Sequence, residues 1–361
     1  MSFSILLDKV YVFVLKIVNL SLFLNGGLYY NIYGEREVFS MLTSMIEKIK
    51  GKGCRIVFPE GNDQRVLSAA VRLKEEGILT PVLLGNVDEV KALAESLNLC
   101  VCGMEIIDPA TDSHMDEFVE KMVELRKGKM DAEACAKALS KTNYYGTMMV
   151  KMGLADGLVG GATYSTADTV RPALQLVKTK PGSKLVSSCF ILVKGDEKLA
   201  MGDCAINIDP TSEDLVEIAI ETAHTAKVFG IEPKVGLLSY STKGSGKGPA
   251  VDKVVNAMNL LAERELDFDV DGEFQFDAAV SPVVAKQKAP DSKVAGQCNT
   301  FIFPNIEAGN IGYKIAQRLG GYEAVGPILQ GLNAPINDLS RGCNSEEVYK
   351  LAIITAAQKY I

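Results

Sequence analysis

The chain has 361 residues, of which 47% are hydrophobic and 23% are charged, and its formal net charge is −7. This composition excludes a disordered or fibrous chain and favours a globular protein long enough for two domains. The acidic balance argues against nucleic-acid binding, and it requires any anion site to be built from a few convergent arginines and backbone amides.

Residues 1–40 differ in character from the rest of the chain. Their apolar runs are interrupted by Asp8, Lys9 and Lys16, so no run is long enough to span a bilayer. No small-residue cleavage site follows, which argues against a signal peptide. We expect this segment to be an extension from a misassigned start, with an interfacial anchor as the alternative.

From Met41 onward, predicted helices and strands alternate. The apolar patterns predict strands at 54–58, 81–84, 158–160, 185–193, 199–203, 235–239 and 301–304. They predict helices at 41–48, 64–76, 87–97, 115–126, 132–141, 166–178, 212–229, 250–264, 310–319 and 346–360. Repeated strand–helix units indicate an α/β fold with open, largely parallel sheets, which bind ligands beyond the carboxyl ends of their strands.

Cysteine and histidine usage gives no sign of a metal site. The eight cysteines include no Cys-x-x-Cys pair, and the only histidines are His114 and His224. We therefore expect no bound metal, and we interpret most thiols as buried residues of a cytoplasmic protein.

The segment 337–347 brings three reactive groups to the start of the last predicted helix. Ser340 offers a hydroxyl, Arg341 a fork of donors for an oxyanion or phosphoryl group, and Glu347 a carboxylate that can act as a base. The structural alternative is that Asn344 caps the helix and that Glu347, three residues later, only completes a capping box. The local pattern alone favours the structural interpretation, because helix caps are commoner than catalytic bases.

Eight blocks in the same order, including this one, resemble the phosphate acetyltransferase family. They are residues 58–65, 155–175, 202–207, 239–245, 271–277, 307–314, 326–332 and 337–347, and the match runs from about Met41 to the end. The resemblance implies reversible acetyl transfer between coenzyme A and phosphate. It implies acetyl-CoA, phosphate and acetyl phosphate as substrates, no tightly bound cofactor, and a homodimer without nucleic-acid or membrane partners.

The resemblance also implies a two-domain architecture similar to the isocitrate and isopropylmalate dehydrogenase fold. The first α/β domain would comprise residues 41–181 and 328–361, and the second would comprise residues 182–327. The active site would lie in the cleft between them.

In the mechanism that the resemblance implies, Glu347 takes the thiol proton of coenzyme A, while Arg341 and Ser340 stabilise the developing charge. Many relatives carry Asp at this position, so the choice between Glu346 and Glu347 stays open. Arg65, Arg126 and Arg171 match family arginines and would surround the substrates, with a solvated helix end as the alternative for Arg126. Ser241, Thr242 and Lys243 begin a glycine-rich loop that lacks the ending of a P-loop and could face phosphate or be a simple turn.

Three rival functions remain. Phosphate butyryltransferase differs only in the size of its acyl pocket. A metal- and nicotinamide-dependent dehydrogenase of the same broad fold would need clustered aspartates, which the blocks do not supply. A non-enzymatic acyl-CoA sensor would not need the intact set of Ser340, Arg341 and Glu347.

Overall fold

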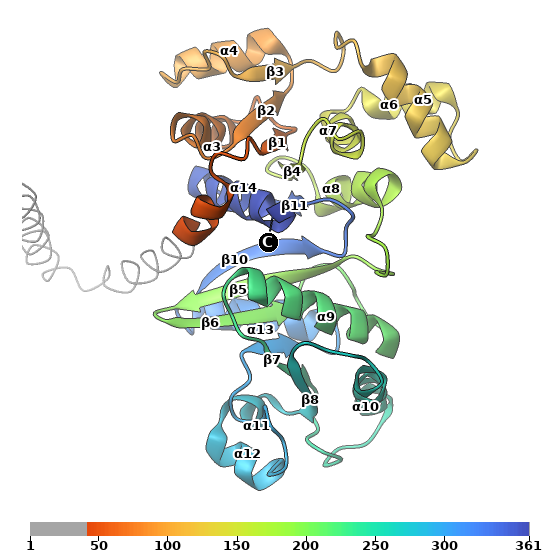
Figure 1. Ribbon diagram of the computed structural model, residues 1–361, viewed down its shortest axis with the longest axis vertical. Coiled ribbons are helices and arrows are strands. Elements are labelled where there is room, and N and C mark those ends of the chain that lie inside the picture. Colours follow the sequence, from red (N-terminus) through yellow and green to blue (C-terminus); the bar gives the residue numbers. More distant parts are fainter. Residues whose placement is uncertain (1–41, 361) are drawn as a thin grey trace, which may run out of the picture.

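The computed structural model describes residues 42–360, which form two α/β domains, one above the other in Figure 1. The expectations for residues 1–40 lie outside this range. After a helix at 42–49, the first domain contains a sheet of five parallel strands in the order β11-β4-β1-β2-β3. Its strands are β1 (Arg55–Phe58), β2 (Thr80–Leu84), β3 (Glu105–Ile107), β4 (Gly157–Gly160) and β11 (Ile336–Asp338). Its helices are α3 (Gln64–Glu75), α4 (Val87–Ser96), α5 (Met115–Arg126), α6 (Ala132–Leu139), α7 (Thr142–Lys151), α8 (Thr166–Pro172), the π-helical turn η1 (Ala173–Val177) and α14 (Ser345–Tyr360).

The second domain is built on a six-stranded sheet in the order β10-β5-β6-β9-β7-β8. β5 is antiparallel to both of its neighbours, and the other pairs are parallel. Its strands are β5 (Ser187–Lys194), β6 (Glu197–Gly202), β7 (Lys234–Leu238), β8 (Asp269–Phe274), β9 (Thr300–Ile302) and β10 (Glu323–Gln330). Its helices are α9 (Ser212–Val228), α10 (Pro249–Ala262), α11 (Phe276–Val280), α12 (Pro282–Lys288) and α13 (Ile306–Arg318).

The predicted fold class is confirmed, because both sheets are dominated by parallel pairs and carry helices. The predicted hairpin of 185–193 and 199–203 is the antiparallel pair β5–β6. The helix predicted at 166–178 is divided into α8 and η1. Strands β3, β8, β10 and β11 and helices α7, α11 and α12 had not been predicted.

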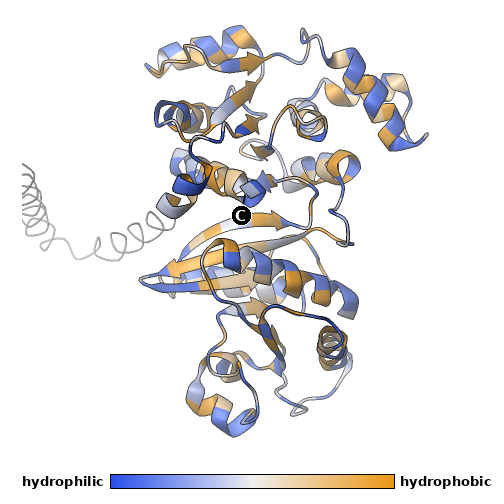
Figure 2. Ribbon diagram, viewed as in Figure 1, coloured by the Kyte–Doolittle hydropathy of each residue, from blue (hydrophilic) through white to orange (hydrophobic). Residues whose placement is uncertain are grey.

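Helix α14 is the element that joins the two domains. It packs on α3, β1 and β4 of the first domain, and its buried side chains share one apolar cluster with Ile191 and Ile328 of the second sheet. Figure 2 shows the hydrophobic stretches of α14 and β10 next to each other at the middle of the molecule. Apolar surface from both domains is therefore removed from water along one helix, which favours a fixed domain arrangement.

Two segments cross between the domains, residues 178–186 and 331–335, and they run side by side. The Lys180 N–H donates to the Gly331 carbonyl (3.0 Å), and the Asn333 N–H donates to the Lys178 carbonyl (2.9 Å). Because β10 continues to Gln330, we propose that the chain returns to the first domain at residue 331 rather than 328.

None of the helices within residues 42–360 combines the length and the hydropathy needed to cross a membrane.

Asn337 connects the domains through a fully buried amide. Its side-chain oxygen accepts from the Leu329 N–H (2.8 Å), and its nitrogen donates to Thr355 (2.8 Å) and Gln358 (2.6 Å) of α14. We expect Asn337→Ala to lower the unfolding free energy by about 2–4 kcal/mol, because three groups on β10 and α14 lose their partner. Urea denaturation measures this, with exposed Asn256→Ala as the control. An unchanged midpoint for Asn337→Ala would contradict the assigned role.

Candidate active site

A cavity of about 500 Å³ lies between the domains and is lined by both of them. From the first domain come the loop after β11 and the first turns of α14, with Ser340, Cys343 and Glu347. From the second come Phe190 of β5, the β10 residues Glu323–Pro327 and one face of α13. The location at the carboxyl end of β11 agrees with the rule for ligand sites in open α/β sheets.

Glu347 both caps α14 and lines this cavity. Its Oε2 accepts the Asn344 N–H (3.0 Å), and the Asn344 side chain accepts the Glu347 N–H (2.9 Å), which completes the capping box. The cap engages only Oε2, so Oε1 is the oxygen that can take a proton from a bound molecule. The two interpretations of Glu347 are therefore compatible.

Glu346 is directed to a different part of the surface. Its carboxylate pairs with Arg72 of α3 (2.6 Å), and the Arg72 guanidinium also bonds Glu76 and stacks on the Tyr349 ring at 3.8 Å. Glu346 does not line the cleft. The geometry thus favours Glu347 over Glu346 as the candidate base.

Arg65 fixes the loop that carries Ser340 and Arg341. Its guanidinium donates to the carbonyls of Arg341 (2.8 Å), Cys343 (3.1 Å) and Ala162 (2.9 Å), and both oxygens of Asp63 accept from it. All five of its N–H donors are thereby used. The expected contact between Arg65 and coenzyme A phosphates stays a prediction, and in this conformation it would require one of these bonds to open.

The loop leaves its two polar side chains accessible. Ser340 and Arg341 are exposed, and the Ser340 hydroxyl accepts only the Gly342 N–H (3.3 Å) among the described residues. Because Arg65 holds the backbone of this loop, the side chains of Ser340 and Arg341 start from a defined position and remain accessible to a ligand.

Cys343 lines the cleft but is a poor nucleophile. Burial raises the pKa of its thiol to about 11, so the thiol stays protonated at neutral pH. This agrees with the interpretation of Cys343 as a packing residue.

Two buried carboxylates lie near each other at the carboxyl ends of the first-domain strands: Asp338, which lines the cleft, and Glu60, which does not line it and was not expected from the sequence. Glu60 accepts the backbone N–H groups of Gly161 (2.8 Å), Ala162 (2.9 Å) and Thr163 (2.5 Å), which follow β4. Successive amides in this position commonly hold phosphate, but here the chain supplies its own anion. These three amides are therefore not free to bind a ligand.

Asp338 lies beside this group at the end of β11. Its oxygens accept hydrogen bonds from Thr166 (2.6 Å) and Thr169 (2.5 Å) of α8, and burial raises the pKa of its carboxyl despite them. The same contacts fix α8 relative to the loop of Ser340.

Arg126 and Arg171 are not among the residues that line the cavity of Glu347. Burial raises the pKa of the Tyr144 hydroxyl, and the charges of Arg171 and Arg126 act against that rise. The Nε of Arg126 is buried and has no hydrogen-bond partner among the described residues. A buried donor of this kind is costly unless an acceptor reaches it.

The structure does not bring Ser241, Thr242 and Lys243 to the cleft. They follow β7, four strands away from β10, or about 19 Å at the usual spacing. Ser241 is buried and donates to Glu273 (2.8 Å), while Lys243 pairs with Asp271 (2.5 Å). Within this chain the loop closes on β8, and its expected contact with substrate stays a prediction.

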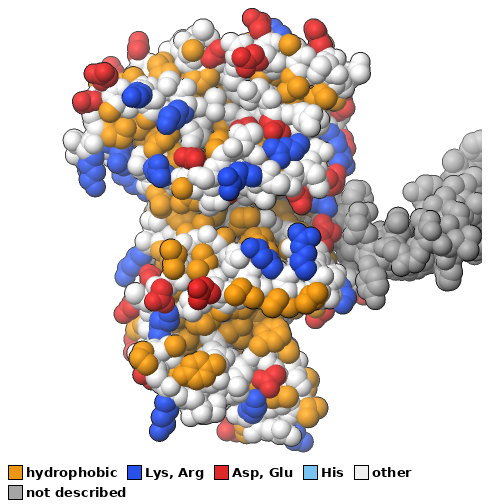
Figure 3. Space-filling view, turned by 180° about the vertical axis from the view of Figure 1, so that it is seen from behind, with side chains coloured by type: hydrophobic (Ala, Val, Ile, Leu, Met, Phe, Trp, Pro, Cys, Tyr) orange, Lys and Arg blue, Asp and Glu red, His pale blue; other side chains and the backbone are white. Residues whose placement is uncertain are grey.

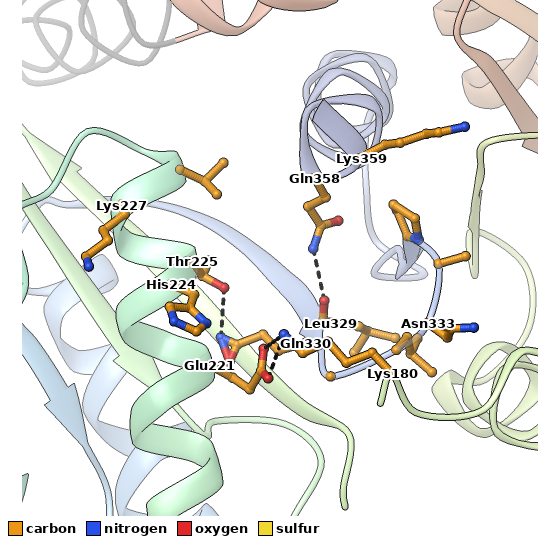
Figure 4. A pocket seen from close by; sticks show the side chains of 15 residues that line it. Lys180, Glu221, His224, Thr225, Lys227, Leu329, Gln330, Asn333, Gln358 and Lys359 are labelled. Carbon is orange, nitrogen blue, oxygen red and sulfur yellow. Dashed lines mark hydrogen bonds and ion pairs between the residues drawn. The ribbon is translucent and has the colours of Figure 1, made fainter. Parts of the chain in front are cut away.

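A second cavity of about 590 Å³ lies at the crossing segments, between α9 and the last turn of α14 (Figure 4). Its lining contains none of the predicted site residues. Its lysines have partners: Lys180 pairs with Glu221, Lys227 with Asp267 and Lys359 with Asp156. The cleft of Glu347 is therefore the better candidate for an active site.

Within residues 42–360, no group of three or more His, Cys, Asp or Glu side chains could hold a metal ion. The aspartate cluster that the rival dehydrogenase would need does not occur in this part of the chain.

Comparison with known proteins agrees with this architecture. A family model described as phosphate acetyl/butaryl transferase matches residues 40–356. The phosphate acetyltransferase of Bacillus subtilis is 57% identical over 318 residues, which cover 88% of this chain and 98% of the relative. A phosphotransacetylase structure from Streptococcus pyogenes has 56% identity and a TM-score of 0.87, and covers 89% of this chain and 98% of that chain.

A phosphotransacetylase structure from Staphylococcus aureus has 53% identity and a TM-score of 0.84, covering 89% of this chain and 99% of that one. Together, the fold, the interdomain cleft and these matches define an acyltransferase built from two α/β domains. The chain belongs to the phosphate acetyl/butyryl transferase family, which confirms the resemblance seen in its sequence.

Arg65 gives a test of how the site is held. We expect Arg65→Ala to lower the unfolding free energy by about 2 kcal/mol or more, because three loop carbonyls and Asp63 lose their partner. Urea denaturation measures the change. Arg65→Lys keeps the charge but cannot reach all four partners, so it should fall between Ala and wild type. Equal stability of all three proteins would show that these bonds do not hold the loop.

Proposed function

We propose that this chain catalyses reversible acetyl transfer between coenzyme A and phosphate, acetyl-CoA + phosphate = acetyl phosphate + coenzyme A. The observation that carries the proposal is the position of Glu347, whose carboxylate lines the interdomain cleft together with Ser340. The relatives named phosphate acetyltransferase or phosphotransacetylase support it. The names of these relatives also favour an enzyme over a non-enzymatic acyl-CoA sensor.

The proposed reaction uses Glu347 as a base and the side chains of Arg341 and Ser340 as hydrogen-bond donors. Glu347 Oε1 takes the proton of the coenzyme A thiol, and the thiolate attacks the carbonyl carbon of acetyl phosphate. Arg341 and Ser340 hold the oxygen on which negative charge develops, a contribution of roughly 3–4 kcal/mol per donor in comparable sites. Phosphate leaves with the bonding electrons, and Glu347 returns the proton in the reverse direction.

Arg126 and Arg171 are suited to the phosphates of coenzyme A, which is long enough to extend beyond the cavity. The buried Nε of Arg126 has a vacant donor, and Arg171 is exposed on α8. Arginine binds phosphate through two parallel hydrogen bonds, so this pair can anchor the distal part of the molecule. Coenzyme A is a substrate in this scheme, and no tightly bound cofactor or metal is needed.

The decisive variant is Glu347→Gln. Glutamine preserves the size and the capping box but cannot take a proton, so we expect turnover to fall by roughly two to four orders of magnitude with normal folding. Release of coenzyme A from acetyl-CoA plus phosphate is measured, with butyryl-CoA assayed in parallel to test the butyryl alternative.

Glu346→Gln is the matched control, since it removes the neighbouring carboxylate that pairs with Arg72. It should keep turnover near wild type. An active Glu347→Gln with an inactive Glu346→Gln would move the base to Glu346, and two active variants would exclude a carboxylate base.

We also propose a homodimer in the cytoplasm. α13 supports the dimer, because Gly309 is its only buried residue, while Ile311, Ile315 and Leu319 are each more than half exposed at helical spacing. Figure 3 shows hydrophobic side chains gathered over the second domain on the rear face. A second copy would cover such a stripe.

We expect Ile315→Glu with Leu319→Glu to convert a dimer to a monomer, because charges are costly in an apolar interface. Analytical ultracentrifugation at micromolar concentration gives the mass, and exposed Arg264→Glu serves as the control. A wild-type protein that sediments as a monomer would refute the dimer.

A further inference from the structure

We propose that Lys314 and Arg318 of α13 bind a substrate phosphoryl group from the second-domain wall of the cleft. The inference rests on the proposed function, and it adds two residues to those expected from the sequence. Both residues belong to the second-domain wall of the cleft.

Lys314 and Arg318 line the same cavity as Ser340 and Glu347, which belong to the first-domain wall. They stand four residues apart on α13, so their side chains lie on one face of the helix. A molecule bound in this cavity can therefore contact both the base and this pair.

Neither cation has an acidic partner in the part of the chain that the structure describes. Lys314 Nζ donates to the neutral Asn310 side chain (2.7 Å) and lies 5.6 Å from the centre of the Tyr313 ring, and Arg318 has no side-chain hydrogen bond or ion pair within the described residues. By contrast, Lys350 lines the same cavity but pairs with Glu323 across the domains (2.8 Å). The cavity is also lined by Asp338, whose carboxyl accepts hydrogen bonds from two threonines, and by Glu347, so among residues 42–360 Lys314 and Arg318 are its cations without an ion-pair partner and can attract an anion.

Helix α13 is packed closely on the second sheet. Tyr313 stacks on Phe190 of β5 with ring centroids 4.0 Å apart. Gly309 lies so close to the residue that follows β6 that an added Cβ would meet the Asp203 carbonyl at 2.4 Å. The helix that presents the pair is thus held against the second sheet, which suits ligand binding better than a mobile surface would.

The amides that follow β4 hold Glu60 and are not free for a phosphoryl group, whereas Lys314 and Arg318 offer charged donors. A phosphoryl group fits both a lysine ammonium and an arginine fork. It can belong to inorganic phosphate and acetyl phosphate, or to coenzyme A, and the experiment separates these sources.

The test compares wild type with Lys314→Gln, Arg318→Gln, the double variant and Arg264→Gln, an exposed arginine that follows α10 and does not line the cavity. Each substrate is varied in turn to give separate KM and kcat values. We expect the double variant to raise one KM by roughly 10-fold or more, with a smaller change in kcat, because charge-assisted bonds to a ground-state phosphoryl group are lost. Arg318→Lys should recover part of the affinity.

A rise in KM for phosphate assigns the pair to the transferred group, and a rise for acetyl-CoA assigns it to coenzyme A. If neither KM rises more than twofold over Arg264→Gln, the inference is wrong. Calorimetric titration with inorganic phosphate and with coenzyme A reads binding without turnover, so it decides the question even if the wild type proved inactive. Equal thermal midpoints for all variants would exclude an effect through folding.

Discussion

The apolar packing of α14 against both domains is the constraint on which the site depends. The helix carries Glu347 in its first turn, and its buried face lies in one cluster with Ile191 and Ile328 of the second sheet. Asn337 adds a directional contact, because its amide binds β10 and α14 at once. The carboxylate of Glu347 therefore has a defined position in the cleft.

Around this helix, the first domain uses its ionic groups mainly to fix backbone. Glu60 holds the turn after β4, Asp338 holds α8, and Arg65 holds the loop of Arg341. Their charges are satisfied internally, so they shape the site without competing for the substrate. The groups that remain available, Ser340, Arg341 and one oxygen of Glu347, are those the proposed reaction needs.

The sequence predicted the alternation of elements and the residues of the last loop well, because these depend on local apolar periodicity and on a short motif. It did not predict the strands whose formation depends on pairing with strands distant in the sequence. β10 contains Gly326-Pro327, at which its pairing with β5 shifts register, and a proline argues against a strand when it is read alone. β8 begins Asp-Val-Asp-Gly, which is hydrophilic, although β7 pairs with it along its whole length.

The site residues divide in the same way, into those grouped by a local motif and those that only the fold brings together. Ser340, Arg341 and Glu347 are neighbours in the chain and could be grouped by inspection. No local signal showed that Glu60 would meet the amides after β4, 101 to 103 residues later, or that Lys314 and Arg318 would face Glu347. Likewise, the Ser241 loop looked suited to phosphate, but its distance from the cleft depends on strand order, which the sequence does not state.

The two crossing segments have a consequence for how this architecture can diversify. Because they pair with each other and enclose residues 187–330 as one insertion, the second domain can vary as a unit while the loop of Ser340 and the start of α14 stay unchanged. The apolar residues that this insertion supplies to the cleft include Phe190, Val325 and Pro327. Substitutions there would reshape the space for the acyl chain without moving the base, so chain-length preference and catalytic chemistry can evolve separately.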